Sequence, residues 1–280
     1  MMKMELFKGI LKIFELEMTE PTMYGWFHIL WLILTVVATV AVCHFFKEGT
    51  EKQVHRVVFF TAILVTLLEI YKQIEFTFSL ENGQIVSDFQ WYAFPFQFCS
   101  TPMYAGLLFG IIRRGKVHKS LGAFLATYAI FAGVCVMLYP NTVFVRTMGI
   151  NIQTMVCHGS MIVVGVYLLY TGYVPLKHRT ILKAVPVFAT AVAIAAVMNE
   201  VAFRTGLLET DEFNMFFISP HCEPSLPVFS LVQPLVPFVV SFIIYIGVFT
   251  LAAYLMILIA MLAKGIATKV RFKKKEQVLS

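Results

Sequence analysis

Two side chains in this sequence suggest covalent chemistry, the thiol of Cys99 and the imidazole of His158. Each is expected near the N-terminal end of an apolar helix, where the helix dipole favours a thiolate and keeps an imidazole neutral. A cysteine nucleophile with a histidine base is the minimum for covalent acyl transfer. Ser100 and Thr101 follow directly and are alternative nucleophiles. The bland alternatives are a packing cysteine and a histidine that only links two helices.

Other polar residues are expected at the same depth as this pair, in otherwise apolar segments. Ionisable groups in hydrocarbon are costly, so they normally face a bundle interior and pair there. The spacing of Glu69, Lys72 and Glu75 places Lys72 within reach of either carboxylate, and either carboxylate could orient the base. For Glu69, the deepest of the three, His28 or His158 is the expected partner. The predicted supporting polar site comprises His28, Glu69, Lys72, Glu75, Gln97 and Asn199.

Composition determines which solvent surrounds these residues. Of the 280 residues, 59% are hydrophobic and 14% are charged, and the mean hydropathy is +0.80. A soluble domain is usually about 45–50% apolar and about 25% charged. These values exclude a soluble globular protein, and they exclude a disordered chain because apolar content is high. The chain is therefore expected to be an integral membrane protein.

A spanning helix needs about 20 mostly apolar residues. The sequence predicts an all-α, polytopic membrane helix bundle with seven transmembrane helices. Their expected ranges are 25–46, 57–78, 94–112, 121–139, 155–173, 181–201 and 231–263.

The basic residues predict the orientation of the bundle. Most of the 22 Lys and Arg fall in loops on one side, which the positive-inside rule assigns to the cytoplasm. The N-terminus is then outside, the C-terminus is inside, and the polar layer faces the outer leaflet of a plasma membrane. The net charge of +6 is explained by these loops, so no nucleic-acid partner is expected.

Three regions follow along the chain. Residues 1–24 are expected to form an amphipathic segment that lies in the membrane interface. Residues 25–263 form the seven-helix domain, whose outer loop 202–230 is either a lid over the polar layer or a flexible surface loop. Residues 264–280 form a basic cytoplasmic tail, expected to bind anionic inner-leaflet lipid.

The five cysteines form no CxxC pair and no metal-ligand spacing, so no disulfide framework, metal or other cofactor is expected. Membrane lipids are the expected partners, and the sequence leaves the oligomeric state open.

Several short motifs resemble the YwaF-like bacterial integral membrane proteins. The run FPFQFC at 94–99 is similar to the LPLHLC signature of that family. The stretch Gly25–His28, the pair His158-Gly159, and Asn199 ahead of a long loop agree with it. Distant eukaryotic relatives of that family are lipid acyltransferases and hydrolases with a Cys or Thr nucleophile and a His on another helix. The resemblance therefore implies lipid acyl transfer in a bacterial plasma membrane, with His158 matching the catalytic His. Gln97 departs from the pattern, because the family usually has His there.

Three functions follow in order of preference. The first is an outer-leaflet lipid acyltransferase or hydrolase that uses Cys99 and His158. The second is a transporter or channel that uses Glu69 and Lys72. The third is a non-catalytic membrane sensor that binds a lipid or another ligand.

Overall fold

The structure is a computed structural model. It describes residues 2–206, 213–224, 226 and 229–279, with side chains described from 4 and as far as 269. The outer loop 202–230 and the basic tail 264–280 therefore lie partly outside the described residues.

Within the described chain, six helices are long and apolar enough to cross a membrane, with α5 and α6 counted as one. The membrane-length elements are α2 (Trp26–Phe45), α3 (Glu51–Glu75), α5 (Gly115–Leu125) with α6 (Tyr128–Leu138), α7 (Met148–Tyr170), α8 (Thr180–Arg204) and α10 (Phe238–Leu279). The shorter elements are α1 (Met2–Phe14), β1 (Phe78–Glu81), β2 (Gln84–Ser87), η1 (Trp91–Ala93), α4 (Thr101–Ile111), η3 (Met215–Phe217), α9 (Phe229–Val232) and η4 (Gln233–Leu235). The chain is thus a polytopic helical membrane protein, and the count of seven spans stays a prediction.

Helix α7 lies at the centre of the bundle and packs against α2, α3 and α6. Small residues let the helices approach closely here. A Cβ atom on Gly159 would lie 2.6 Å from Thr35 Oγ1 of α2. One on Gly133 of α6 would lie 2.6 Å from the carbonyl oxygen of His158. His158 is therefore held between two tightly packed neighbours.

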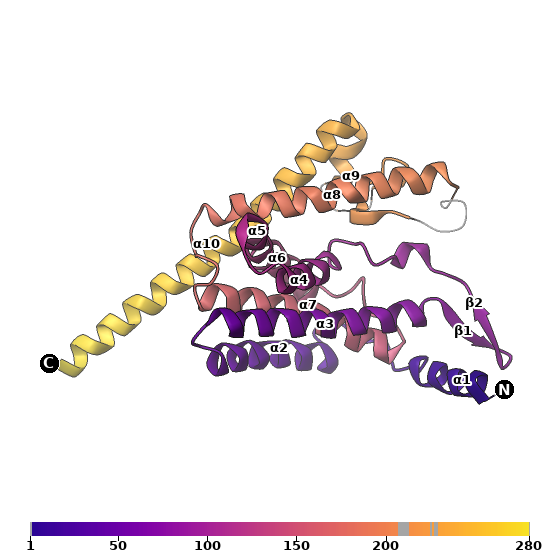
Figure 1. Ribbon diagram of the computed structural model, residues 1–280, viewed down its shortest axis with the longest axis horizontal. Helices are drawn as coiled ribbons and strands as arrows, with labels where there is room; N and C mark the ends of the chain where they lie inside the picture. The colour runs from indigo at the N-terminus through magenta and orange to yellow at the C-terminus, as the bar shows by residue number, and fades with distance from the viewer. Residues whose placement is uncertain (1, 207–212, 225, 227–228, 280) are drawn as a thin grey trace.

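The contacts between helices also place α8 and α10 in the bundle. Helix α8 packs on α5, and α10 packs on α6 and α8. Figure 1 shows the two termini at opposite ends of the long axis, with α10 extending past the other helices. The predicted helix 231–263 begins only at Phe238, because Pro234 and Pro237 interrupt the chain after α9.

The predicted helix 94–112 is wrong in its first half. It is helical only over Thr101–Ile111, about 16 Å at 1.5 Å per residue and too short to cross a bilayer. Pro102 has no backbone N–H, so a helix running through it from residue 94 would lose a hydrogen bond there. Residues 94–100 instead form turns, which the Phe96 and Ser100 amides close onto the carbonyl oxygens of Phe94 and Gln97.

This irregular segment lies beside a spanning helix. The Gln73 side chain of α3 donates to the carbonyl oxygen of Ala93 at 2.8 Å, and Tyr104 donates to that of Pro95 at 2.7 Å. Helix α4 then packs along α3, where a Cβ on Gly106 would lie 2.8 Å from the Cβ of Ala62. Non-helical backbone beside a spanning helix is tolerated only where protein buries it or where it lines a cavity.

One end of the bundle is capped by α1 and the β1–β2 hairpin, which stand together in Figure 1. The Phe7 ring meets Phe78 edge to face at 5.5 Å, and Glu15 accepts the Leu80 amide at 2.8 Å. The segment 1–24 is thus helical over Met2–Phe14 and rests on a hairpin that the sequence did not predict. Its location in the membrane interface stays a prediction.

Candidate functional site

Cys99 lies in a tight turn immediately before α4, and not within a helix as expected. The Ser100 amide donates to the carbonyl oxygen of Gln97 at 2.9 Å, which closes the turn around Cys99. The cysteine is partly buried, and the neighbouring Ser100 is buried. The Thr101 hydroxyl donates to the carbonyl oxygen of Phe98 at 2.7 Å. Of the three candidate nucleophiles, Thr101 therefore has its hydroxyl proton engaged by the backbone.

His158 lies deeper than the sequence suggested, because α7 begins at Met148 and not at residue 155. The ring is about 15 Å along the helix from that start. It is buried, and its Nδ1 lies 2.7 Å from the carbonyl oxygen of Thr154. A carbonyl can only accept, so Nδ1 carries the proton and Nε2 presents a lone pair. Nε2 is buried and has no hydrogen-bond partner among the described residues. This is the tautomer that a general base requires.

Glu69 pairs with Lys72 on its own helix. The Lys72 Nζ lies 2.7 Å from Glu69 Oε1, and Gln73 Nε2 donates to the same oxygen at 3.0 Å. The expected contact of Lys72 with a neighbouring carboxylate is therefore observed for Glu69. The expectation that His28 or His158 would pair with Glu69 is wrong, because a local i, i+3 pair satisfies the carboxylate.

This ion pair links the reactive groups. Lys72 lies close enough to Cys99 and His158 to interact electrostatically with both. Cys157, next to His158, interacts with Cys99, Glu69 and Lys72. Groups from α3, the turn before α4 and α7 are thus gathered in one region. Within the described chain, Cys99 and His158 are not joined by a hydrogen bond.

Gln97 and Asn199 hold a second irregular segment, residues 213–219. The Gln97 amide donates to the carbonyl oxygen of Asn214 at 3.0 Å and accepts the Phe216 amide at 2.8 Å. Asn199 is fully buried and exchanges two hydrogen bonds with the backbone of Met215, at 2.8 and 3.0 Å. Both side chains thus supply partners that a helix would otherwise provide.

The two remaining residues of the predicted polar site, His28 and Glu75, lie elsewhere in the bundle. His28 is fully buried, accepts the Tyr24 amide at 2.9 Å and donates to the carbonyl oxygen of Met137 at 2.8 Å. Nε2 therefore joins α2 to α6, and Nδ1 is used by the backbone just before α2. Glu75 lies near Tyr71 and Glu15, and its Oε2 is buried without a hydrogen bond among the described residues. Among the described residues, neither side chain forms a hydrogen bond or an ion pair with Cys99 or His158.

A pocket of about 440 Å³ opens between α3 and the segment before α4. That volume lies within the usual range for a ligand pocket. Glu69 and Gln73 line it together with apolar side chains, among them Met103 and Ile70. Ile70 is 51% exposed on the outward face of α3, so the pocket opens sideways from the bundle. Sequence reasoning missed this opening, since it depends on the chain leaving helical geometry before Thr101.

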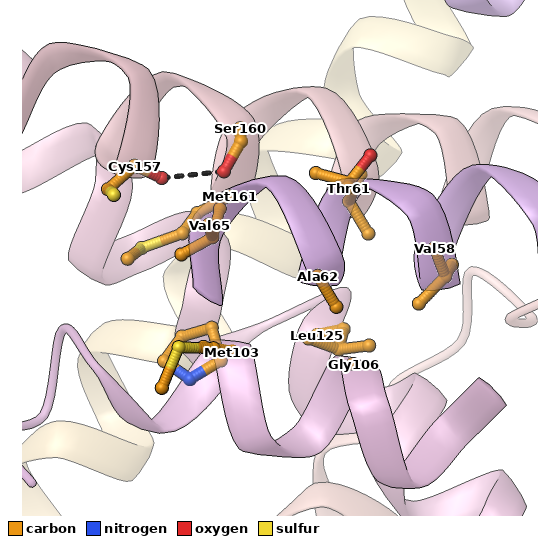
Figure 2. A pocket seen from close by; sticks show the side chains of 12 residues that line it. Val58, Thr61, Ala62, Val65, Met103, Gly106, Leu125, Cys157, Ser160 and Met161 are labelled. Atoms are coloured by element: carbon orange, nitrogen blue, oxygen red, sulfur yellow. Dashed lines mark hydrogen bonds between the residues drawn. The ribbon is translucent and has the colours of Figure 1, made fainter. Parts of the chain in front are cut away.

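An apolar layer lies one turn further along the same helices (Figure 2). It surrounds a cavity of about 30 Å³, room for one or two waters. Val65 and Ala62 of α3, Met103 of α4 and Met161 of α7 face it. The Ser160 hydroxyl at its edge donates to the carbonyl oxygen of Cys157 at 2.7 Å. This layer therefore bounds Glu69 and the polar groups around it along α3. Among the described residues, no group of three His, Cys, Asp or Glu side chains could hold a metal ion.

The fold and the buried polar groups define a polytopic helical membrane protein with polar residues inside its bundle. The model of the TMEM164 family matches residues 23–263, so the chain belongs to the TMEM164 family. No curated protein and no solved structure is detectably similar to it. The expected membership of the YwaF-like bacterial family is therefore wrong, and the bacterial origin inferred with it has no support.

Proposed function

We propose that this protein is a membrane-embedded lipid acyltransferase or lipid hydrolase, in which Cys99 is the nucleophile and His158 is the base. The observation that carries the proposal is the state of His158. Its Nδ1–H is fixed on a backbone carbonyl, and its buried Nε2 has no partner among the described residues. A buried polar atom without a partner is costly, and a catalytic role is one of the few explanations for keeping it.

The first half-reaction forms a thioester. Nε2 of His158 takes the thiol proton, and the Cys99 sulfur attacks the carbonyl carbon of a lipid ester. The C–O bond breaks, and the leaving alkoxide takes the proton from His158. In the second half-reaction a lipid hydroxyl or water gives its proton to Nε2 and attacks the thioester. The C–S bond breaks, and the thiol regains its proton. Catalytic hydrogen bonds are often formed only with substrate bound, so a separation of Cys99 and His158 in the free protein is compatible with this scheme.

Lys72 supplies the positive charge. Its ammonium group lies within electrostatic range of Cys99. The amides of Ser100, Thr101 and Met103 already donate to backbone carbonyls, and Pro102 has no N–H. The start of α4 thus has few free donors for the oxyanion of the tetrahedral intermediate. The Lys72 ammonium group is the remaining donor that we assign to it.

The position of the pocket supports a lipid substrate. It opens beside the exposed Ile70 on a helix with the length and composition of a membrane span. A lipid ester could therefore enter sideways from the bilayer. We place this pocket in the outer leaflet, on the strength of the basic residues in the loops at the other end.

The two alternative functions have less support. A transporter needs a polar path, whereas an apolar layer underlies the polar groups on α3, α4 and α7. A sensor that only binds a ligand would not need a buried imidazole nitrogen that has no hydrogen-bond partner among the described residues. Turnover of a lipid would exclude the sensor.

The test is acyl turnover by the purified protein in nanodiscs. A diester phospholipid with a labelled acyl chain is supplied with a hydroxyl-bearing lipid, and transfer and hydrolysis are both measured. Cys99→Ala and His158→Ala should abolish both. Cys157→Ala is the matched control, because it removes a neighbouring thiol and should keep activity. Ser100→Ala and Thr101→Val should retain turnover. Activity that survives Cys99→Ala would disprove the mechanism.

A further inference from the structure

We infer that Gln97 is a positioning residue, which anchors the Cys99 turn to the segment 213–219 and so sets the direction of the thiol. This inference rests on the function proposed above, because it gives that nucleophile its support. Two features of Gln97 carry it: its backbone forms the turn, and its side chain ties the turn to a rigid neighbour.

The backbone of Gln97 closes the turn. Its carbonyl oxygen accepts the amides of Ser100 at 2.9 Å and Thr101 at 3.2 Å. Cys99 lies in the turn between Gln97 and Ser100. The same residue then reaches across the bundle with its side chain, to the carbonyl oxygen of Asn214 and the amide of Phe216. A movement of this side chain therefore moves the turn that carries the thiol.

The partner segment is fixed independently of Gln97. Phe216 and Phe217 have φ values of 58° and 54°, a conformation that bulky residues adopt only when the surroundings impose it. The Tyr245 hydroxyl donates to the carbonyl oxygen of Phe216 at 2.9 Å. Asn199 holds Met215 from α8. Gln97 is thus attached to a backbone that other residues already constrain.

The aromatic neighbours of the turn cannot replace this anchor. The rings of Phe96 and Phe98 lie 6.1 and 5.9 Å from that of Phe216, in tilted arrangements. Such contacts fix direction less strictly than a hydrogen bond does, so they leave the turn free to shift. Within the described chain, the Gln97 amide is the polar link between the turn and the segment 213–219. An amide is also what the position requires, because one end must donate while the other accepts.

The experiment compares three variants in a Cys135→Ser/Cys222→Ser background, which removes the two more accessible thiols other than Cys99. The alkylation rate of Cys99 by a maleimide is measured in nanodiscs together with kcat and KM. Gln97→Leu should lower kcat about a hundredfold with little change in KM, as expected when a reacting group is misplaced by about 1 Å. Tyr245→Phe is the matched control. It removes one hydrogen bond to the same Phe216 and should change kcat much less.

Gln97→Glu provides the readout that a merely structural role would not give. As a carboxylate it accepts only, and it faces the carbonyl oxygen of Asn214. When protonated it again donates at one oxygen and accepts at the other. The ratio of its alkylation rate to that of the parent should therefore rise as the pH falls from about 8 to about 5.5, whereas the Gln97→Leu ratio should stay flat.

The outcomes separate the two proposals. A pH-independent Gln97→Glu ratio, or equal effects of Gln97→Leu and Tyr245→Phe, would overturn the role of Gln97. Turnover that persists in Cys99→Ala would instead overturn the proposed function. If Gln97→Leu fails to fold, the pH series of Gln97→Glu decides the question alone.

Discussion

The two ends of the α3–α4 pair use polar residues in opposite ways. The site end comprises the Glu69–Lys72 pair, the Cys99 turn and the segment 213–219. The stack end comprises the rings of His55, Phe109 and His118. At the site end, side-chain amides bond to backbone groups of chain that has left helical geometry. At the stack end, α3, α4 and α5 are regular helices that need no such partners.

The histidines of the stack end serve as aromatic rings. His118 lies 4.0 Å from Phe109 and 5.0 Å from His55, each time stacked. His118 Nε2 meets the Tyr173 hydroxyl at 2.8 Å. Both nitrogens of His55 and Nδ1 of His118 have no hydrogen-bond partner among the described residues. Residue type and depth therefore do not define the role of a polar side chain in this bundle. The role depends on whether the backbone beside the side chain has left helical geometry.

The largest effect on stability is expected at the site end, from Asn199→Leu. The change leaves the buried N–H and C=O of Met215 without partners, each at a cost of about 1–3 kcal/mol. The free energy of unfolding, measured by SDS titration in bicelles, should fall by about 2–6 kcal/mol. A loss below about 0.5 kcal/mol, typical of surface substitutions, would show that the two hydrogen bonds between Asn199 and Met215 are dispensable.

The next largest loss of stability is expected from Lys72→Met. This change leaves the Glu69 carboxylate charged and about 90% buried, without its ion-pair partner. Removing one member of a buried pair typically costs about 3–5 kcal/mol. The double variant Lys72→Met/Glu69→Leu should recover most of that stability, because it leaves no uncompensated charge. Lipid turnover should not recover. If turnover did recover, Lys72 would have no catalytic role.

A smaller loss of stability is expected from Gly165→Ala in α7. Its Cβ would lie 2.2 Å from a side-chain carbon of Ile130 and 2.7 Å from the carbonyl oxygen of Leu125. Such overpacking typically costs about 1–3 kcal/mol. Gly247→Ala in α10 is the control, since nothing lies within 4 Å of its new Cβ. It should be neutral or stabilising by up to about 1 kcal/mol.

The smallest effect is expected from His55→Phe at the stack end. The change removes two buried nitrogens without partners and keeps an aromatic ring beside Phe109 and His118. Stability should be unchanged or slightly higher, and lipid turnover should match the parent. A marked loss of turnover would contradict the assignment of chemistry to the site end alone.

The sequence predicted the features that depend on composition and local spacing. Apolar runs located the six membrane-length helices, and the i, i+3 spacing predicted the contact between Glu69 and Lys72. The depth predicted for His158 was wrong, because α7 begins seven residues earlier than expected.

The sequence could not predict where the chain leaves helical geometry. The Phe-rich run 94–98 is apolar enough for a helix, and only Pro102 marks the later start. The backbone partner of Gln97 lies 119 residues away along the chain, and that of Asn199 lies 16 residues away. No local pattern encodes either contact. The tautomer of His158 follows from its contact with the carbonyl oxygen of Thr154, four residues earlier on α7, which the sequence analysis did not predict.

The most direct test is detection of the covalent intermediate. The protein is mixed in nanodiscs with a diester phospholipid, the hydroxyl-bearing acceptor is withheld, and acylated peptides are mapped by mass spectrometry. A hydroxylamine-sensitive acyl group should appear on the peptide that contains Cys99. It should form about 10²–10⁴-fold more slowly in His158→Ala. An acyl group on another residue, or turnover by Cys99→Ala without any adduct, would contradict the proposed mechanism.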